Sequence, residues 1–118
     1  MILHIATRVD WEQAQARGEY RAASLDTEGF IHCSTEMQVV PVANAFYRGR
    51  NDLVLLVIEA SRLKPELKWE APAGPAAAGI STADLFPHIF GALNLAAVAS
   101  VVDFAPGPDG LFSLPSLT

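Results

Sequence analysis

A short apolar stretch from Gly29 to Thr35 contains a histidine, a thiol and two hydroxyl groups. If this stretch is a strand, its alternating side chains place His32 and Ser34 on one face and Cys33 on the other. At roughly 3.3 Å of rise per residue, His32 and Ser34 leave that face about 7 Å apart. This spacing suits two groups that bind neighbouring parts of one small molecule, because an imidazole can donate to and accept from a ribose hydroxyl.

The same residues also have ordinary structural interpretations. A histidine in a strand is often half-buried and hydrogen-bonded to backbone. Thr35 and Gln38 have the spacing of a capping box at the start of a helix. A helix start also presents backbone amides that favour an anion, so capping and ligand binding are compatible. We therefore take Ser34 and Thr35 as candidate ligand contacts, and Cys33 as a small core residue.

A second histidine lies in the apolar run from Leu85 to Gly91. Alternation puts His88 on the same face as Phe86 and Phe90, which could form an aromatic wall for a flat ring. Ordinary core packing explains the two phenylalanines equally well. Two carboxylates, Glu70 beside Trp69 and Glu59 at the end of an apolar run, could act as a general base or stabilise a developing cation.

The polar turn that follows the helix expected over residues 35–47 contains two arginines. Arg48 and Arg50 could clamp a phosphate if the turn lies near a cleft, and Tyr47 beside them is a further candidate ligand contact. The possible nitrogen and sulfur ligands for a metal are the three histidines and the single cysteine. None has the paired spacing of a zinc site, so we predict no metal.

Composition limits the class of protein. With 118 residues, 51% hydrophobic and 18% charged, the chain is expected to form a single globular domain over residues 1–118. The net charge of −5, from 8 basic and 13 acidic residues, argues against a nucleic-acid surface. No apolar segment is long enough to span a membrane, and the N-terminus lacks a secretion signal. One cysteine fits the reducing cytoplasm.

The hydrophobic pattern predicts an α+β fold, with helices in the N-terminal half and a largely antiparallel sheet. Residues 19–28 are expected to be an irregular connection, and 72–84, rich in Ala, Gly and Pro, a mobile loop. Pro87 favours an edge strand or a bulge. Pro41 predicts a kinked or delayed helix. The expected helices cover residues 9–17 and 35–47, and the expected strands cover residues 2–7, 30–33, 53–60, 67–71, 86–90, 98–104 and 110–114.

Several motifs occur in an order that resembles a known family of small bacterial proteins, domain of unknown function 952. The resemblance runs from about residue 2 to about residue 112 and is most specific in its two histidine motifs. It is carried by Trp11-Glu12, Gly29-Phe30-Ile31-His32-Cys33-Ser34-Thr35, Asp52-Leu53-Val54-Leu55-Leu56, Trp69-Glu70 and Phe86-Pro87-His88-Ile89-Phe90-Gly91.

This family is similar in pattern to the ADP-ribosyltransferase superfamily, in which a split antiparallel sheet holds NAD in a cleft. The resemblance implies that His32-Cys33-Ser34 contacts the riboses of NAD and that the strand with His88 lines the nicotinamide side. Phe90 departs from the usual pattern, which has tyrosine there. Glu70 and Glu59 are the candidates for the catalytic carboxylate. We therefore expect a cleft that binds NAD or a related nucleotide, with His32, His88 and Glu70 as catalytic candidates.

Three other functions fit the same residues. A non-catalytic sensor could use the same cleft to bind a small molecule. A hydrolase or transferase of another substrate could use His32 or His88 as its general base. A protein-interaction module could use the apolar loop at residues 72–79.

Overall fold

Strand β4 (Leu53–Ile58) is the centre of the fold, and both of its faces are buried. The structure is a computed structural model that describes residues 1–72, 79–81 and 84–117. Strand β4 pairs antiparallel with β1 (Ile2–Thr7) on one side and β8 (Val98–Phe104) on the other. Packing on both faces of β4 explains why its sequence is continuously apolar, as predicted.

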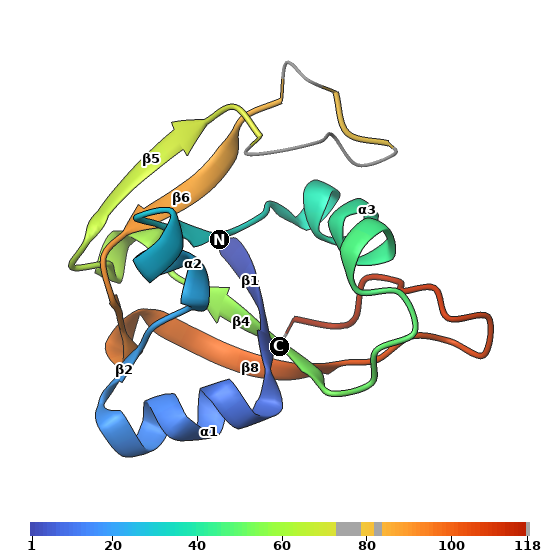
Figure 1. Cartoon of the computed structure of the whole chain (residues 1–118), viewed down its shortest axis with the longest axis horizontal. Coiled ribbons are helices and arrows are strands. Elements are labelled where there is room, and N and C mark those ends of the chain that lie inside the picture. Colours follow the sequence, from blue (N-terminus) through green and yellow to red (C-terminus); the bar gives the residue numbers. More distant parts are fainter. Residues whose placement is uncertain (73–78, 82–83, 118) are drawn as a thin grey trace.

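Two helices lie on opposite faces of this sheet (Figure 1). Alternate residues of β4, including Leu56, face a core cluster that contains Ala14 of α1 (Arg8–Arg17). The residues between them, including Leu55, face a second cluster that contains Val39 of α3 (Glu36–Phe46). The alternation of a strand thus divides one apolar run between two cores.

A second antiparallel sheet carries both histidine motifs. Its central strand β6 (Phe86–Phe90) pairs with β3 (Ile31–His32) and with β5 (Glu66–Glu70). The two sheets meet at Leu3 of β1 and Ser34, whose backbone groups exchange hydrogen bonds of 2.8 Å in both directions. This junction lies just after β3 and holds the sheet of β3, β6 and β5 against β1.

The remaining elements are short. They are β2 (Glu19–Tyr20), α2 (Ala23–Thr27), the 3₁₀ turns η1 (Ala60–Arg62) and η2 (Leu95–Ala97), and β7 (Leu93–Asn94), which pairs with β2. The prediction of an irregular connection over residues 19–28 is wrong, because β2 and α2 form there. Within the described part of the chain, no helix is long and apolar enough to cross a bilayer.

The structure corrects the expectation of a delayed start for the helix with Pro41 and the expectation of an edge or bulge position for Pro87. Helix α3 begins at Glu36, so Pro41 does not delay its start; Gln38 accepts from the backbone N–H of Thr35 at 3.0 Å and stabilises the first turn. Pro87 lies in a central strand. The carbonyl of Pro87 accepts from Cys33 N–H, so the Pro87 nitrogen also points toward Cys33. Cys33 follows the last residue of β3, so the hydrogen bond that proline cannot donate would lie just beyond the β3–β6 pairs.

The strand expected over residues 110–114 does not form. Phe112 is instead buried against Phe104, with ring centroids 4.6 Å apart, and its N–H donates to Asn44 Oδ1 at 2.7 Å. The Asn44 side chain thus accepts the backbone hydrogen bond that a neighbouring strand would otherwise accept. The predicted mobile loop over residues 72–84 falls largely on 73–78 and 82–83, outside the described residues.

Substitution of Gly91 by alanine is expected to destabilise the fold by about 1–3 kcal/mol. A Cβ at Gly91 would lie 2.8 Å from Cβ of Pro65, whose ring has little freedom to move away. Urea unfolding of the variant measures the change. Gly107→Ala is the matched control, because its Cβ would have no neighbour closer than 3.4 Å. Equal stabilities of the two variants would contradict a steric requirement for glycine at position 91.

Candidate functional site

A cleft of about 600 Å³ lies along the free edge of β1. The backbone groups of Leu3 point away from β4, since they bond to Ser34. By the alternation of an antiparallel strand, the N–H and C=O of Ile5 point to the same edge, where no described residue pairs with them. The open strand edge therefore presents backbone donors and acceptors to a ligand in the cleft.

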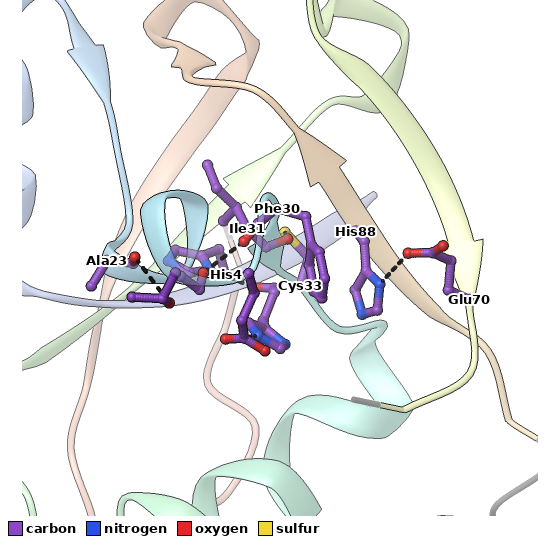
Figure 2. Close-up of polar contacts among 11 residues, drawn as sticks. His4, Ala23, Phe30, Ile31, Cys33, Glu70 and His88 are labelled. Carbon is purple, nitrogen blue, oxygen red and sulfur yellow. Dashed lines mark hydrogen bonds and ion pairs between the residues drawn. The ribbon is translucent and has the colours of Figure 1, made fainter. Parts of the chain in front are cut away.

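The two predicted histidines meet on one wall of this cleft. His32 and His88 are directly opposite each other in the β3–β6 pairing, and both line the cleft. Their ring centroids are 5.5 Å apart at an angle of 72°. Figure 2 shows the ring of Phe30 beside that of His88, and the two rings stack with centroids 4.1 Å apart. Strand pairing and aromatic packing thus fix both imidazoles.

Each imidazole bonds to one carboxylate. Nε2 of His32 is 3.0 Å from Oε2 of Glu28, and Nδ1 of His88 is 2.8 Å from Oε1 of Glu70 (Figure 2). A carboxylate accepts hydrogen bonds, so these two nitrogens carry the proton. In the neutral rings the other nitrogens, Nδ1 of His32 and Nε2 of His88, carry lone pairs, and neither has a partner among the described residues. Each ring can therefore act as a hydrogen-bond acceptor or general base.

A third histidine fixes the backbone of the first. His4 is buried, and its Nδ1 donates to the carbonyl of His32. Its Nε2 therefore accepts from the Tyr20 hydroxyl at 2.8 Å. Burial lowers the pKa of His4 to about 4, so the ring is neutral near pH 7. Burial, together with the negative charge of Asp10, raises the pKa of Tyr20.

Both residues that follow His32 line the cleft, and Cys33 also belongs to a core cluster. Ser34 lines the cleft, and its hydroxyl has no partner among the described residues. Cys33 is 4% exposed, and burial raises the pKa of its thiol, which keeps it protonated. Cys33 is thus the core residue that the alternation predicted. Thr35 caps α3 and is not among the residues that line the cleft.

The far end of the cleft is formed by the end of α3 and the turn after it. Tyr47 and Arg50 line the cleft there, and the guanidinium carbon of Arg50 lies 5.8 Å from the centre of the Tyr47 ring. Asp52 accepts from Nε and Nη2 of Arg50 at 3.1 and 2.6 Å. Arg48 lines a separate shallow depression with Asn44 and does not reach the cleft.

Comparisons with known proteins identify the family. The family described as a protein of unknown function (DUF952) matches residues 5–101. The chain belongs to the DUF952 family. No significant match was found among curated proteins. Within the described residues, no group of three or more His, Cys, Asp or Glu side chains is placed to hold a metal ion.

Solved structures similar to this DUF952 chain come from CC0527 of Caulobacter crescentus. The crystal structure of CC0527 is 34% identical, covers 96% of this chain and 93% of that chain, and has a TM-score of 0.81. Its solution NMR structure is 35% identical, covers 93% and 89% of the two chains, and has a TM-score of 0.75. These similarities extend over nearly the whole DUF952 fold.

Most of the predicted site residues of the DUF952 chain come together, and some do not. Those that line the cleft or bond to a residue that does are His32, Ser34, Tyr47, Glu70, Phe86 and His88. Those that lie elsewhere are Thr35, Arg48, Glu59 and Phe90. Phe90 packs beside Phe30 and under the Lys68 ammonium, which lies 4.8 Å from the ring centre. The roles of all these residues in binding or catalysis stay predictions.

Sequence reasoning missed Glu28, His4 and Tyr20 as parts of the DUF952 site. Glu28 lies in an acidic turn, four residues before His32. Its contact with His32 depends on the path of this turn, which the residue types do not indicate. The sequence indicates His4 only as one of the possible metal ligands. A histidine within an otherwise apolar strand is a usable signal, since a buried imidazole needs hydrogen-bond partners.

Proposed function

We propose that this chain binds NAD or a related nucleotide in the cleft and that His32 and His88 both contact one ribose of the ligand. The observation that carries the proposal is the facing pair of imidazoles, 5.5 Å apart, each with one nitrogen bonded to a carboxylate and one nitrogen free. The free nitrogens suit the hydroxyls of a sugar. The Ser34 hydroxyl adds a third polar group on the same wall.

The size of the cleft and the form of the fold support this ligand. Small-molecule sites typically measure about 300–1,000 Å³, and the cleft measures about 600 Å³. Two antiparallel sheets that meet beside one cleft are compatible with the resemblance to ADP-ribosyltransferases. We place this activity in the cytoplasm, where a single buried cysteine stays reduced.

The reaction we propose is cleavage or transfer at the glycosidic bond of the bound nucleotide. The bond between ribose C1′ and the nicotinamide nitrogen breaks, and its electron pair leaves with nicotinamide. Positive charge then develops on the ribose, and the carboxylates behind the two imidazoles stabilise it through the rings they orient. Water or an acceptor hydroxyl bonds to C1′ and gives its proton to the free Nε2 of His88.

Substitution of His32 by alanine is expected to weaken NAD binding about 10-fold, the typical loss for one hydrogen bond of about 1.4 kcal/mol. The fold should persist, because the His32 side chain is 42% exposed. The measurement is a titration with NAD, followed by NMR of the histidine rings and by release of nicotinamide. Arg62→Ala, outside the cleft lining, is the control. Unchanged His32 and His88 signals in the wild-type protein at millimolar NAD would contradict the proposal.

A second candidate function follows from the two imidazole–carboxylate pairs. One free ring nitrogen can serve as general base and the other ring, once protonated, as general acid in hydrolysis of another small substrate. A bell-shaped pH–rate profile that does not depend on NAD would favour this hydrolase over the nucleotide transferase. Nicotinamide release that is lost in His32→Ala would favour the transferase.

A further inference from the structure

Arg50 is the one Lys or Arg among the described residues that line the cleft. Asp52 holds its guanidinium through Nε and Nη2, at 3.1 and 2.6 Å. The third nitrogen, Nη1, has no partner among the described residues. Asp52 therefore fixes the plane of the guanidinium and leaves one edge able to donate.

Tyr47 supplies a second donor beside this edge. Its ring lies under Arg50, 5.8 Å from the guanidinium carbon, and it also lines the cleft. Its hydroxyl has no hydrogen-bond partner in the described part of the chain. Burial raises the pKa of Tyr47, so the hydroxyl keeps its proton and can donate. A fixed cation and a neutral hydroxyl together suit a phosphate oxygen.

Two carboxylates of the described residues line the cleft, Glu28 and Asp10, and neither bonds to Arg50. Glu28 pairs with His32, and the charge of Asp10 acts on Tyr20 and His4. The pKa of Arg50 is raised by its hydrogen bonds to Asp52 and by Tyr47. Asp52, the carboxylate that bonds to Arg50, occupies the Nε and Nη2 edge of the guanidinium. An anion at Nη1 would therefore contact the opposite side.

The position of Arg50 along the cleft sets the length of the ligand. The histidine wall joins β1 at Leu3, whereas Arg50 precedes Leu53, which pairs with Thr7 at the other end of β1. Leu3 and Thr7 are four positions apart along the strand, a span of about 13 Å. We therefore expect a nucleoside bound at the histidines to end short of Arg50, and phosphate groups that extend along β1 to reach it.

We propose that Arg50 and Tyr47 form a phosphate subsite, so that the cleft selects phosphorylated nucleotides over free nucleosides. This inference rests on the proposed function for the sugar end of the ligand. The phosphate end is tested separately, because pyrophosphate alone can occupy the subsite.

The test compares Arg50→Gln with Arg48→Gln by calorimetric titration of ADP-ribose, adenosine and inorganic pyrophosphate. Loss of a charge-assisted hydrogen bond is expected to weaken ADP-ribose binding about 10- to 100-fold in Arg50→Gln. Adenosine binding should be equal in all three proteins. Arg48→Gln is the matched control, since Arg48 lies at a separate depression two residues away. Thermal melting confirms that each variant is folded, and Tyr47→Phe repeats the test without removing a charge.

The outcomes separate this inference from the proposed function. Equal ADP-ribose affinity in the wild-type and Arg50→Gln proteins overturns the subsite and leaves nucleotide binding intact. Adenosine that binds the wild-type protein as tightly as ADP-ribose also overturns it. Pyrophosphate binding that is lost in Arg50→Gln supports the subsite even where adenosine does not bind. Absence of binding by ADP-ribose and by pyrophosphate at millimolar concentration overturns both proposals.

Discussion

Glutamine in place of Glu70 is expected to lower turnover of the proposed reaction by about 10²- to 10⁴-fold, the usual contribution of a general acid or base. Glu70 accepts from Nδ1 of His88 at 2.8 Å and so leaves the lone pair of that ring on Nε2. A glutamine amide can donate to Nδ1 instead, which would move the ring proton to Nε2 and remove the base. Binding of NAD should change little, because Glu70 is not among the cleft-lining residues.

The matched control for this prediction is Glu59→Gln. Glu59 has the same side chain, is the other carboxylate that the sequence indicates, and accepts from Ser61 outside the cleft lining. Nicotinamide release at saturating NAD measures turnover, and nitrogen NMR shifts of His88 report which ring nitrogen carries the proton. If Glu70→Gln and Glu59→Gln turn over NAD at the same rate, Glu70 does not orient a catalytic His88.

The alternation of strand side chains explains why much of the site could be predicted from the sequence. Residues 30–34 and 86–90 each contain a histidine flanked at two-residue spacing by aromatic or hydroxyl side chains. Once both segments were taken as strands, the face of each histidine followed from the period of two. That His32 and His88 lie opposite each other depends on the pairing register, which local sequence does not specify.

The parts of the site that could not be predicted depend on short elements and on turns. Strand β2 has two residues and α2 has five, too few for a periodic signal. Tyr20 and Glu28 lie in or beside these elements, so their contacts with the histidines follow from tertiary structure alone. The same reason applies to the two arginines. A turn with Arg at residues 48 and 50 indicates a possible anion site, but only the path of the chain decides that Arg50 lines the cleft.

Acid is expected to destabilise the fold through His4 and to lower the free energy of unfolding by up to about 3 kcal/mol. The folded-state pKa of His4 is about 4, below the ordinary value of 6.5, because the ring is buried between Tyr20 and the His32 backbone. Between pH 6.5 and pH 4 the unfolded chain binds a proton at His4 that the folded chain does not bind. The free energy of unfolding therefore has its full value above pH 6.5 and falls as the pH decreases toward 4.

Urea unfolding at pH 7 and at pH 4.5 tests this expectation in the wild-type, His4→Asn and Tyr20→Phe proteins. Asparagine keeps a donor for the His32 carbonyl and has no proton to gain, so the loss of stability between the two pH values should be about 2–3 kcal/mol smaller than in the wild type. Tyr20→Phe keeps the buried imidazole but removes the hydroxyl that donates to its neutral form, so it should retain most of the wild-type pH dependence. All other acidic and basic side chains are the same in the proteins compared, so their contributions cancel. A pH dependence in His4→Asn equal to that of the wild type would show that His4 is not the group that couples folding to acid.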